Sequence, residues 1–398
     1  MPMTCRLKSE LVLAVETSCD DTSAAVVAGG RRVLSSHVAS QEEVHALFGG
    51  VVPEVASRKH VEAITHVVQA ALDEAGVGWH DLGGLAVTNG PGLIGSLLVG
   101  VSAMKAYCLA TGLPLVGVNH LDAHVNSNFC DLPAEGPNSG GSIAAIRPQG
   151  RMGLQPSASG PFGPSTGAPE DFPALCLIAS GGHSDLVLVR SRSDFELLGC
   201  TRDDAAGEAL DKAARVLELG YPGGPAIQRA AAQGQPRFAL PRPNIEDSLD
   251  YSFAGLKTAL LRLAEQLRPE GELPLGDLAA SYQEAVVDTL VRNVRRAAAG
   301  PLSGAAAPRG RGAGVRSRSE AEPAGDSIRQ ILLCGGVAAN KLLRERLSQL
   351  GQELGIPVHY PPFALCTDNA AMVGAAGWLK LTTGQHDNLA LDVFSAMP

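Results

Sequence analysis

The chain carries the same order of apolar and glycine-rich segments twice. Residues 11–27 and 175–189 each predict a pair of strands, because short apolar runs flank a polar or glycine-containing loop. Residues 85–101 and 331–347 each predict a strand, a glycine-rich turn and a helix. We therefore predict a duplicated α/β fold with two lobes and a ligand cleft between them. The alternative is a chance match between two common α/β units.

Two irregular segments divide this plan. Residues 132–172 are rich in Gly, Pro and Ser, and residues 300–326 are rich in Ala, Gly and Arg. Neither shows helical or strand periodicity, so we expect flexible surface insertions. The N-terminal lobe is then expected over residues 1–131 and the C-terminal lobe over residues 173–398, which includes the second insertion.

The composition excludes several classes of protein. The 398 residues are 45% hydrophobic and 18% charged, which is typical of a globular chain. No run of about 18 apolar residues occurs, so we predict no membrane-spanning helix. The eight cysteines form no C-x-x-C pair, which disfavours a disulfide framework and indicates a reducing compartment. Residues 1–10 lack the pattern of a signal or transit peptide, so we expect the cytoplasm, with an organelle matrix as the alternative.

The net charge of −9 disfavours bulk attraction to nucleic acid. A local basic patch remains compatible with it. Arg292, Arg295 and Arg296 form one candidate patch and the arginines within residues 309–318 form another, although either group can simply be solvated.

His120 and His124 are the most conspicuous candidate metal ligands. Residues four apart lie on one face of a helix, so both imidazoles can reach one ion. Zinc-dependent proteases carry a glutamate directly after the first histidine, whereas this chain has Leu121, so the protease reading lacks its base. Asp368 can add a carboxylate, or it can merely cap the helix that begins there. Two nitrogens and one oxygen suit Fe²⁺ or Zn²⁺.

Two segments are candidates for binding phosphate. The loop from Ser180 to His183 contains Gly181 and Gly182, whose backbone N–H groups can reach an anion, although a plain hairpin turn can have the same sequence. Residues 16–22 carry acids and hydroxyls, which fit a phosphate or metal–phosphate site or a polar turn.

Three segments are candidates for binding the rest of a nucleotide. Acids within residues 203–212 can accept hydrogen bonds from ribose, or form a solvated face. Residues 221–225 predict a rigid turn because prolines bracket two glycines. Residues 335–340 predict a strand-to-helix turn, at which Asn340 can contact a base or ribose.

Taken in order, these segments resemble the universal tRNA threonylcarbamoyladenosine synthase family, formerly called O-sialoglycoprotein endopeptidases. The similar runs span residues 11–381 outside the two insertions and include LAVETSCDDTSAAVV, NHLDAH, ASGGHSDLVLV, GGVAANKLLRERL and CTDNAAMVGAAG. The resemblance implies the duplicated actin/Hsp70/sugar-kinase fold, which is RNase H-like. It implies transfer of a threonylcarbamoyl group from threonylcarbamoyl-adenylate to N6 of the position-37 adenosine in tRNAs that read ANN codons, with release of AMP.

The resemblance also implies ligands and partners. His120, His124 and Asp368 would hold one divalent metal ion per subunit, Fe²⁺ in the first place and Zn²⁺ as the alternative. The adenylate site would be lined by Ile178, Ala179, Ser180, Gly181, Gly182, Asp211, Gly224 and Asn340. Some relatives have an acid at a further contact, where this chain has Gln228. The implied partners are tRNA, a separate synthase that supplies the adenylate, an inactive paralogue of the same fold and a P-loop ATPase. A metalloprotease and a non-catalytic nucleotide-binding scaffold are the alternative functions.

Overall fold

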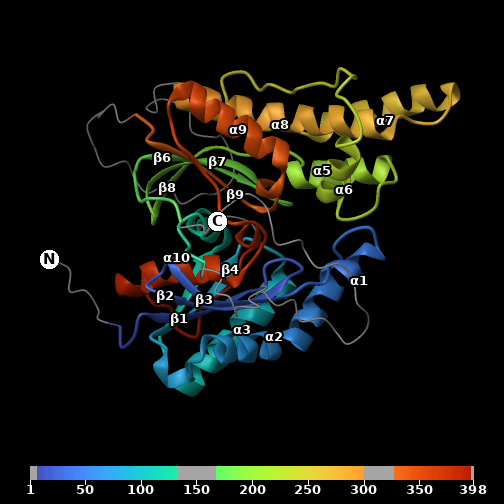
Figure 1. Cartoon of the computed structure of the whole chain (residues 1–398). Helices are drawn as coiled ribbons and strands as arrows, with labels where there is room; N and C mark the ends of the chain where they lie inside the picture. The colour runs from blue at the N-terminus through green and yellow to red at the C-terminus, as the bar shows by residue number, and fades with distance from the viewer. Residues whose placement is uncertain (1–6, 133–166, 300–326, 396–398) are drawn as a thin grey trace, which may run out of the picture. The chain divides into compact units, whose positions relative to one another are not determined.

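The computed structural model describes residues 7–132, 167–299 and 327–395. Most of the first predicted insertion and all of the second lie outside these residues. The described chain divides into two compact units. Figure 1 shows the chain coloured by residue number. Unit 1 takes its residues from Met1–His45, Val51–Pro169 and Pro361–Pro398, and unit 2 takes its residues from Ala46–Gly50 and Glu170–Tyr360.

This division corrects one predicted boundary. The predicted C-terminal lobe runs to residue 398, but residues from Pro361 onward pack with unit 1. The reason is helix α10 (Ala370–Thr382), whose small apolar side chains pack against β1, β2 and β4 of unit 1.

The sheet of unit 1 has the strand order β3-β2-β1-β4-β5. The first three strands form an antiparallel meander, and β4 and β5 run parallel to β1. The bounds are β1 (Leu11–Glu16), β2 (Thr22–Ala28), β3 (Arg32–Ala39), β4 (Gly84–Gly90) and β5 (Leu115–Asn119).

Helices cover both faces of this sheet. Successive side chains of β1 point to opposite faces, and Val12 to Glu16 are all buried, so both faces must be covered. Leu13 and Val15 pack in the core under α2 (Pro53–Ala75) and α3 (Ile94–Thr111). Val12 and Ala14 face the other way, into the core formed with α10. The remaining elements of this part of the chain are α1 (Glu42–Ala46), η1 (Trp79–Asp81), α4 (His120–Ser127) and η4 (Phe363–Leu365).

Helix α3 is, by length and composition alone, apolar enough to cross a membrane. The sequence prediction of no spanning helix was based on uninterrupted apolar runs. Lys105, two glycines and two serines interrupt the apolar sequence of α3. In the structure α3 packs against β4 and α2 through Leu97, Val101 and Met104, which are buried. This packing is that of a helix covering a sheet.

Unit 2 repeats the strand arrangement of unit 1, with the order β10-β9-β6-β7-β8. Again three strands form a meander, and two run parallel to its first strand. The predicted duplication is therefore confirmed strand by strand. The bounds are β6 (Ala174–Ala179), β7 (Ser184–Ser191), β8 (Asp194–Gly199), β9 (Gln330–Cys334) and β10 (Val358–His359).

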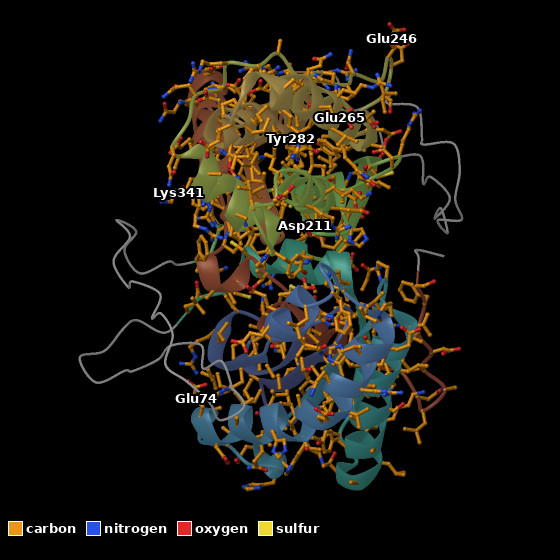
Figure 2. The ribbon with its side chains drawn as sticks, turned by 90° about the vertical axis from the view of Figure 1, so that its right-hand side faces the viewer. Glu74, Asp211, Glu246, Glu265, Tyr282 and Lys341 are labelled. Carbon is orange, nitrogen blue, oxygen red and sulfur yellow. The ribbon has the colours of Figure 1, made fainter. Side chains whose placement is uncertain are left out.

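The helices of unit 2 pack on one another as well as on its sheet. Helix α8 lies against β6, and α6 and α9 pack against α8. Tyr282 Oη donates a hydrogen bond to Ala209 O (3.0 Å), which ties α8 to α5; Tyr282 is labelled in Figure 2. The bounds are α5 (Ala206–Val216), α6 (Gly223–Ala231), α7 (Ala254–Leu267), η2 (Arg268–Glu270), α8 (Leu275–Ala299), η3 (Gly336–Ala339) and α9 (Lys341–Leu354).

Candidate metal centre and nucleotide-binding loops

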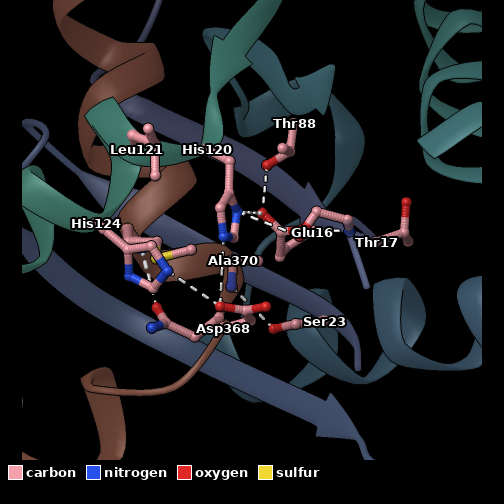
Figure 3. Close-up of polar contacts among 12 residues, drawn as sticks. Glu16, Thr17, Ser23, Thr88, His120, Leu121, His124, Asp368 and Ala370 are labelled. Carbon is pink, nitrogen blue, oxygen red and sulfur yellow. Dashed lines mark hydrogen bonds and ion pairs between the residues drawn. The ribbon is translucent and has the colours of Figure 1, made fainter. Parts of the chain in front are cut away.

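His120, His124 and Asp368 converge in unit 1, with one ligand atom of each within 4.8 Å of the others (Figure 3). Asp368 Oδ1 lies 3.6 Å from His120 Nε2 and 3.1 Å from His124 Nε2. Both histidines are buried, whereas the Asp368 side chain is 24% exposed, so the group opens to solvent at the carboxylate.

The start of α4 places the two histidines. The side-chain oxygen of Asn119 accepts hydrogen bonds from Leu121 N (2.8 Å) and Asp122 N (3.4 Å), so the helix begins at His120, directly after β5. His124 follows one turn later on the same face, and the two rings are 4.6 Å apart.

Asn369 caps α10, so the cap alternative for Asp368 is wrong. The Asn369 side chain accepts a hydrogen bond from Met372 N (3.0 Å). The Ser23 hydroxyl of β2 accepts another from Ala370 N (2.9 Å), which anchors the start of the helix to the sheet. Asp368 is thereby held beside the histidines without serving as the cap.

The charges around these residues favour a cation. Burial alone lowers the pKa of His120, but the carboxylates of Asp368 and Glu16 outweigh it and raise that pKa to about 9. Within the described residues, His124 Nδ1 and Nε2 are buried without a hydrogen-bond partner, although Nε2 is close to Asp368. The close approach of these three ligand atoms suits a shared ion, and two nitrogens and a carboxylate oxygen fit a divalent metal.

The loop after β1 adds the half-buried acids Asp20 and Asp21 to unit 1. Burial, with repulsion from Asp20, raises the pKa of Asp21 to about 7. His60 supports the loop, because its Nε2 lies 3.0 Å from Cys19 O and its Nδ1 lies 2.8 Å from Thr22 Oγ1. Burial also raises the pKa of the Cys19 thiol well above its usual value, so this cysteine is a poor nucleophile.

In unit 2, the loop after β6 is closed by its own hydrogen bonds. Ser180 N donates to His183 O (2.8 Å), and His183 N donates to Ser180 Oγ (3.1 Å). Gly181 and Gly182 lie between them and are exposed. A Cβ atom added at either glycine would meet nothing within 4 Å, so the loop leaves open space where a ligand can approach the backbone.

Other glycines let neighbouring elements approach this loop. A Cβ at Gly207 would lie 2.6 Å from Ser180 O, and Gly207 N donates to that same oxygen (3.1 Å). Gly335 has a φ of +89°, and its Cβ would lie 2.3 Å from Ala179 O. The start of α5 and the turn after β9 therefore both lie against the end of β6.

The acidic side chains within residues 203–212 make different contacts. Asp203 caps α7 by accepting hydrogen bonds from Phe253 N (2.7 Å) and Ala254 N (3.2 Å). Asp204 forms an ion pair with Lys212 (2.5 Å). Asp211, labelled in Figure 2, accepts a hydrogen bond from Gly223 N (2.7 Å) and so holds the start of α6.

The predicted turn at residues 221–225 is in fact the start of a helix, because α6 begins at Gly223 with Pro222 as its N-cap. Gly224 has nothing within 4 Å of an added Cβ. Gln228 Oε1 accepts a hydrogen bond from Lys341 N (2.8 Å), which links α6 to the start of α9.

Asn340 is a helix cap. Its side-chain oxygen accepts from Leu343 N (3.1 Å), and its amide donates to Gln283 Oε1 (2.9 Å). A contact from Asn340 to a nucleotide would therefore use its amide group. The predicted adenylate residues all belong to unit 2. They lie at the end of β6 and in the loop after it, in the middle of α5, and at the starts of α6 and α9.

Comparison with known proteins identifies the family. A family model described as tRNA N6-adenosine threonylcarbamoyltransferase matches residues 32–142 and 162–375.

The chain belongs to this family.

Two similar relatives carry the same description, tRNA N6-adenosine threonylcarbamoyltransferase. The protein of Dehalococcoides mccartyi is 44% identical over 387 residues, which cover 97% of this chain and 98% of that protein. The protein of Thermomicrobium roseum is 43% identical over 410 residues, which cover 98% and 96%. The predicted acyltransferase activity class is thereby confirmed.

A solved structure supports the fold. HypF from T. kodakarensis aligns with a TM-score of 0.51 at 14% identity, over 96% of this chain and 49% of that chain. At this identity the likeness concerns the fold alone. With the repeated sheets it confirms the predicted duplicated α/β class.

By the family description, the threonylcarbamoyltransferases act on tRNA. The arginines of α8 were predicted as a candidate basic patch for nucleic acid. Arg292 donates to Arg242 O (3.3 Å), and Arg296 donates to Ser248 O (2.7 Å). Arg295 forms an ion pair with Glu353 of α9 (2.6 Å). These arginines tie neighbouring segments to α8. The second candidate patch, residues 309–318, lies outside the described residues.

Proposed function

We propose that this protein transfers the threonylcarbamoyl group of L-threonylcarbamoyl-adenylate to N6 of the position-37 adenosine in tRNAs that read ANN codons, and releases AMP. The observation that carries the proposal is the convergence of His120, His124 and Asp368 in a member of the threonylcarbamoyltransferase family.

The three converging residues would hold one divalent ion, Fe²⁺ in the first place and Zn²⁺ as the alternative. A bound ion would supply a Lewis acid that polarises a carbonyl oxygen. The role of the chain is to present two imidazole nitrogens from one helix face and a carboxylate from the start of α10, with solvent access on the carboxylate side.

Unit 2 would bind the adenylate. The backbone N–H groups of Gly181 and Gly182 would donate hydrogen bonds to the phosphate, which the open space beside both glycines supports, and Asp211 and Asn340 would hold the nucleoside. The bond from adenine N6 to the carbamoyl carbon forms as the bond from that carbon to the phosphate oxygen breaks. AMP carries away the electron pair of the broken bond, and N6 releases a proton to water. No covalent enzyme intermediate is needed, in keeping with the raised pKa of the Cys19 thiol.

The proposed setting is a reducing cytoplasm. No disulfide joins any two of the seven cysteines among the described residues, which supports it. The proposed partners, beyond tRNA and the adenylate-forming synthase, are an inactive paralogue of the same fold and a P-loop ATPase.

The test combines metal analysis with a transfer assay. The His120→Ala/His124→Ala double variant is incubated with labelled threonylcarbamoyl-adenylate, the proposed partners and an ANN-reading tRNA. We expect bound metal to fall from about one ion per chain to near zero and transfer to fall by at least about 100-fold, because both imidazole ligands are lost. His80→Ala, a change at an exposed histidine of unit 1, should leave both values unchanged.

The same assay separates the alternatives. Full transfer by the metal-free double variant would disprove the metal role, and equal labelling of a tRNA with guanosine at position 37 would disprove the acceptor. Peptide cleavage without transfer would support the protease alternative. Adenylate binding without turnover would support a scaffold.

A further inference from the structure

A buried carboxylate lies behind His120, on the side away from Asp368. His120 Nε2 is directed toward Asp368 Oδ1 (3.6 Å), and His120 Nδ1 lies 3.3 Å from Glu16 Oε2 (Figure 3). Glu16 is the last residue of β1 and is completely buried. A carboxylate without solvent is costly unless hydrogen-bond donors surround it, so this position calls for an explanation.

Each Glu16 oxygen accepts a hydrogen bond from a fixed donor. Ser18 N donates to Oε1 (2.5 Å), and the Thr88 hydroxyl of β4 donates to Oε2. His120 Nδ1 lies 3.3 Å from the same Oε2, and the Ser18 hydroxyl oxygen lies 3.2 Å from that nitrogen, where it can accept the Nδ1 proton together with Glu16. Because β1 and β4 are neighbours in the sheet, the carboxylate is held in one orientation between them.

We propose that Glu16 is a positioning residue that fixes the tautomer and the ring orientation of His120 for metal binding. An ionised carboxylate can only accept, so His120 must carry a proton on Nδ1 to bond with it. The lone pair then lies on Nε2, the nitrogen that faces Asp368. This inference rests on the metal centre of the proposed function and assigns to Glu16 a role in building it.

The two histidines of the candidate metal centre differ in whether a carboxylate contacts the Nδ1 atom. His124 Nδ1 has no hydrogen-bond partner within the described residues. His120 is therefore the ligand that the fold orients in advance, and the effect of Glu16 should appear in metal affinity rather than in folding.

Glu16→Gln is the sharpest test, because it keeps the shape and replaces one oxygen by an amide. If the amide faces His120, it donates to Nδ1 and forces the proton onto Nε2, which removes the ligand lone pair. If it faces Ser18 N, two donors oppose each other. Either arrangement weakens metal binding, and we expect the Kd for Zn²⁺, measured against a competing chelator, to rise about 10- to 100-fold.

Glu74→Gln is the matched control. Glu74, labelled in Figure 2, contacts another buried histidine of the same unit, with His37 Nε2 at 2.7 Å. This variant makes the same chemical change away from the centre and should bind Zn²⁺ as the unmodified protein does. Thr88→Val keeps Glu16 but removes one of its donors, and we expect a Kd increase of only a few-fold.

A second readout reports the tautomer directly. In ¹⁵N spectra of metal-free protein at a pH where His120 is neutral, the unmodified chain should show a protonated Nδ1 on His120, and Glu16→Gln should lose it. Unchanged Zn²⁺ affinity in Glu16→Gln, or a proton on Nε2 in the unmodified chain, would overturn the inference. If Glu16→Gln does not fold, Thr88→Val and the tautomer of the unmodified chain still decide it. Failure of the unmodified protein to bind any metal would instead contradict the proposed function.

Discussion

Gly335 and Gly181 lie in neighbouring loops of unit 2 but have different surroundings. Gly335 has a left-handed backbone and lies against Ala179 O, whereas Gly181 faces open space. Gly335 therefore allows two segments to pack closely, whereas Gly181 leaves room for a ligand.

The same substitution at these two glycines should change the stability of the protein by different amounts. Gly335→Ala should lower the free energy of unfolding by about 2 to 4 kcal/mol, because the new methyl group meets a carbonyl oxygen at a positive φ. Gly181→Ala should change it by no more than about 0.5 kcal/mol. Urea denaturation of both variants checks this, and an equal loss in the two would contradict it.

At the scale of elements, α10 approaches its sheet unusually closely. A Cβ at Gly377 would lie 2.4 Å from Ala86 Cβ of β4, and one at Gly374 would lie 2.7 Å from Val27 of β2. This close packing holds α10, and with it Asp368, against the sheet of unit 1, and α10 also packs against α4, the helix that carries both histidines.

Gly377→Ala should therefore destabilise unit 1 by about 1 to 3 kcal/mol, because overpacking outweighs the better helix propensity of alanine. Gly255→Ala in α7 is the matched control, since a Cβ there meets nothing within 4 Å. It should be neutral or stabilise by up to about 1 kcal/mol. Thermal unfolding of both variants gives the comparison, and a stabilised Gly377→Ala would argue against the close packing.

For the molecule as a whole, buried acids shape the dependence of stability on pH. Burial, with repulsion from Asp250, raises the pKa of Asp185 to about 7, above the usual 3.8. The folded chain then binds this proton more tightly than the unfolded chain does. Its contribution to stability is full at low pH and is lost as the pH rises from about 4 to 7.

Asp185→Asn removes this ionisation, so it should stabilise the protein at pH 8 by about 1 to 3 kcal/mol, with the gain shrinking toward pH 4. Urea denaturation at several pH values measures the difference. Asp194→Asn, at an exposed position of β8, should show no such trend. A gain in Asp185→Asn that does not vary with pH would rule out this explanation.

The sequence pattern predicted the duplication because each copy alternates apolar runs with glycine turns. It missed β8, whose first four residues are exposed or half-buried, and β10, which has only two residues. It also placed residues 361–398 with the wrong unit. Residues Ala370 to Gly377 are all buried, so their sequence does not indicate which sheet they cover. His120, His124 and Asp368 were predicted as a group. Glu16 was not, because its contact with His120 depends on strand neighbours distant in sequence, although an acid ending a buried strand is a usable signal.

The order of these residues along the chain has a consequence for biosynthesis. The ribosome delivers Glu16, His120 and His124 early, then residues 170–360, which make up most of unit 2, and only then Asp368 and α10. A nascent chain halted within unit 2 has both imidazoles but neither the carboxylate ligand nor the helix that covers that face of the first sheet. A metal ion held by all three residues would therefore bind only after translation through residue 368. Incomplete products would lack one ligand, so metal content would be a measure of completed synthesis.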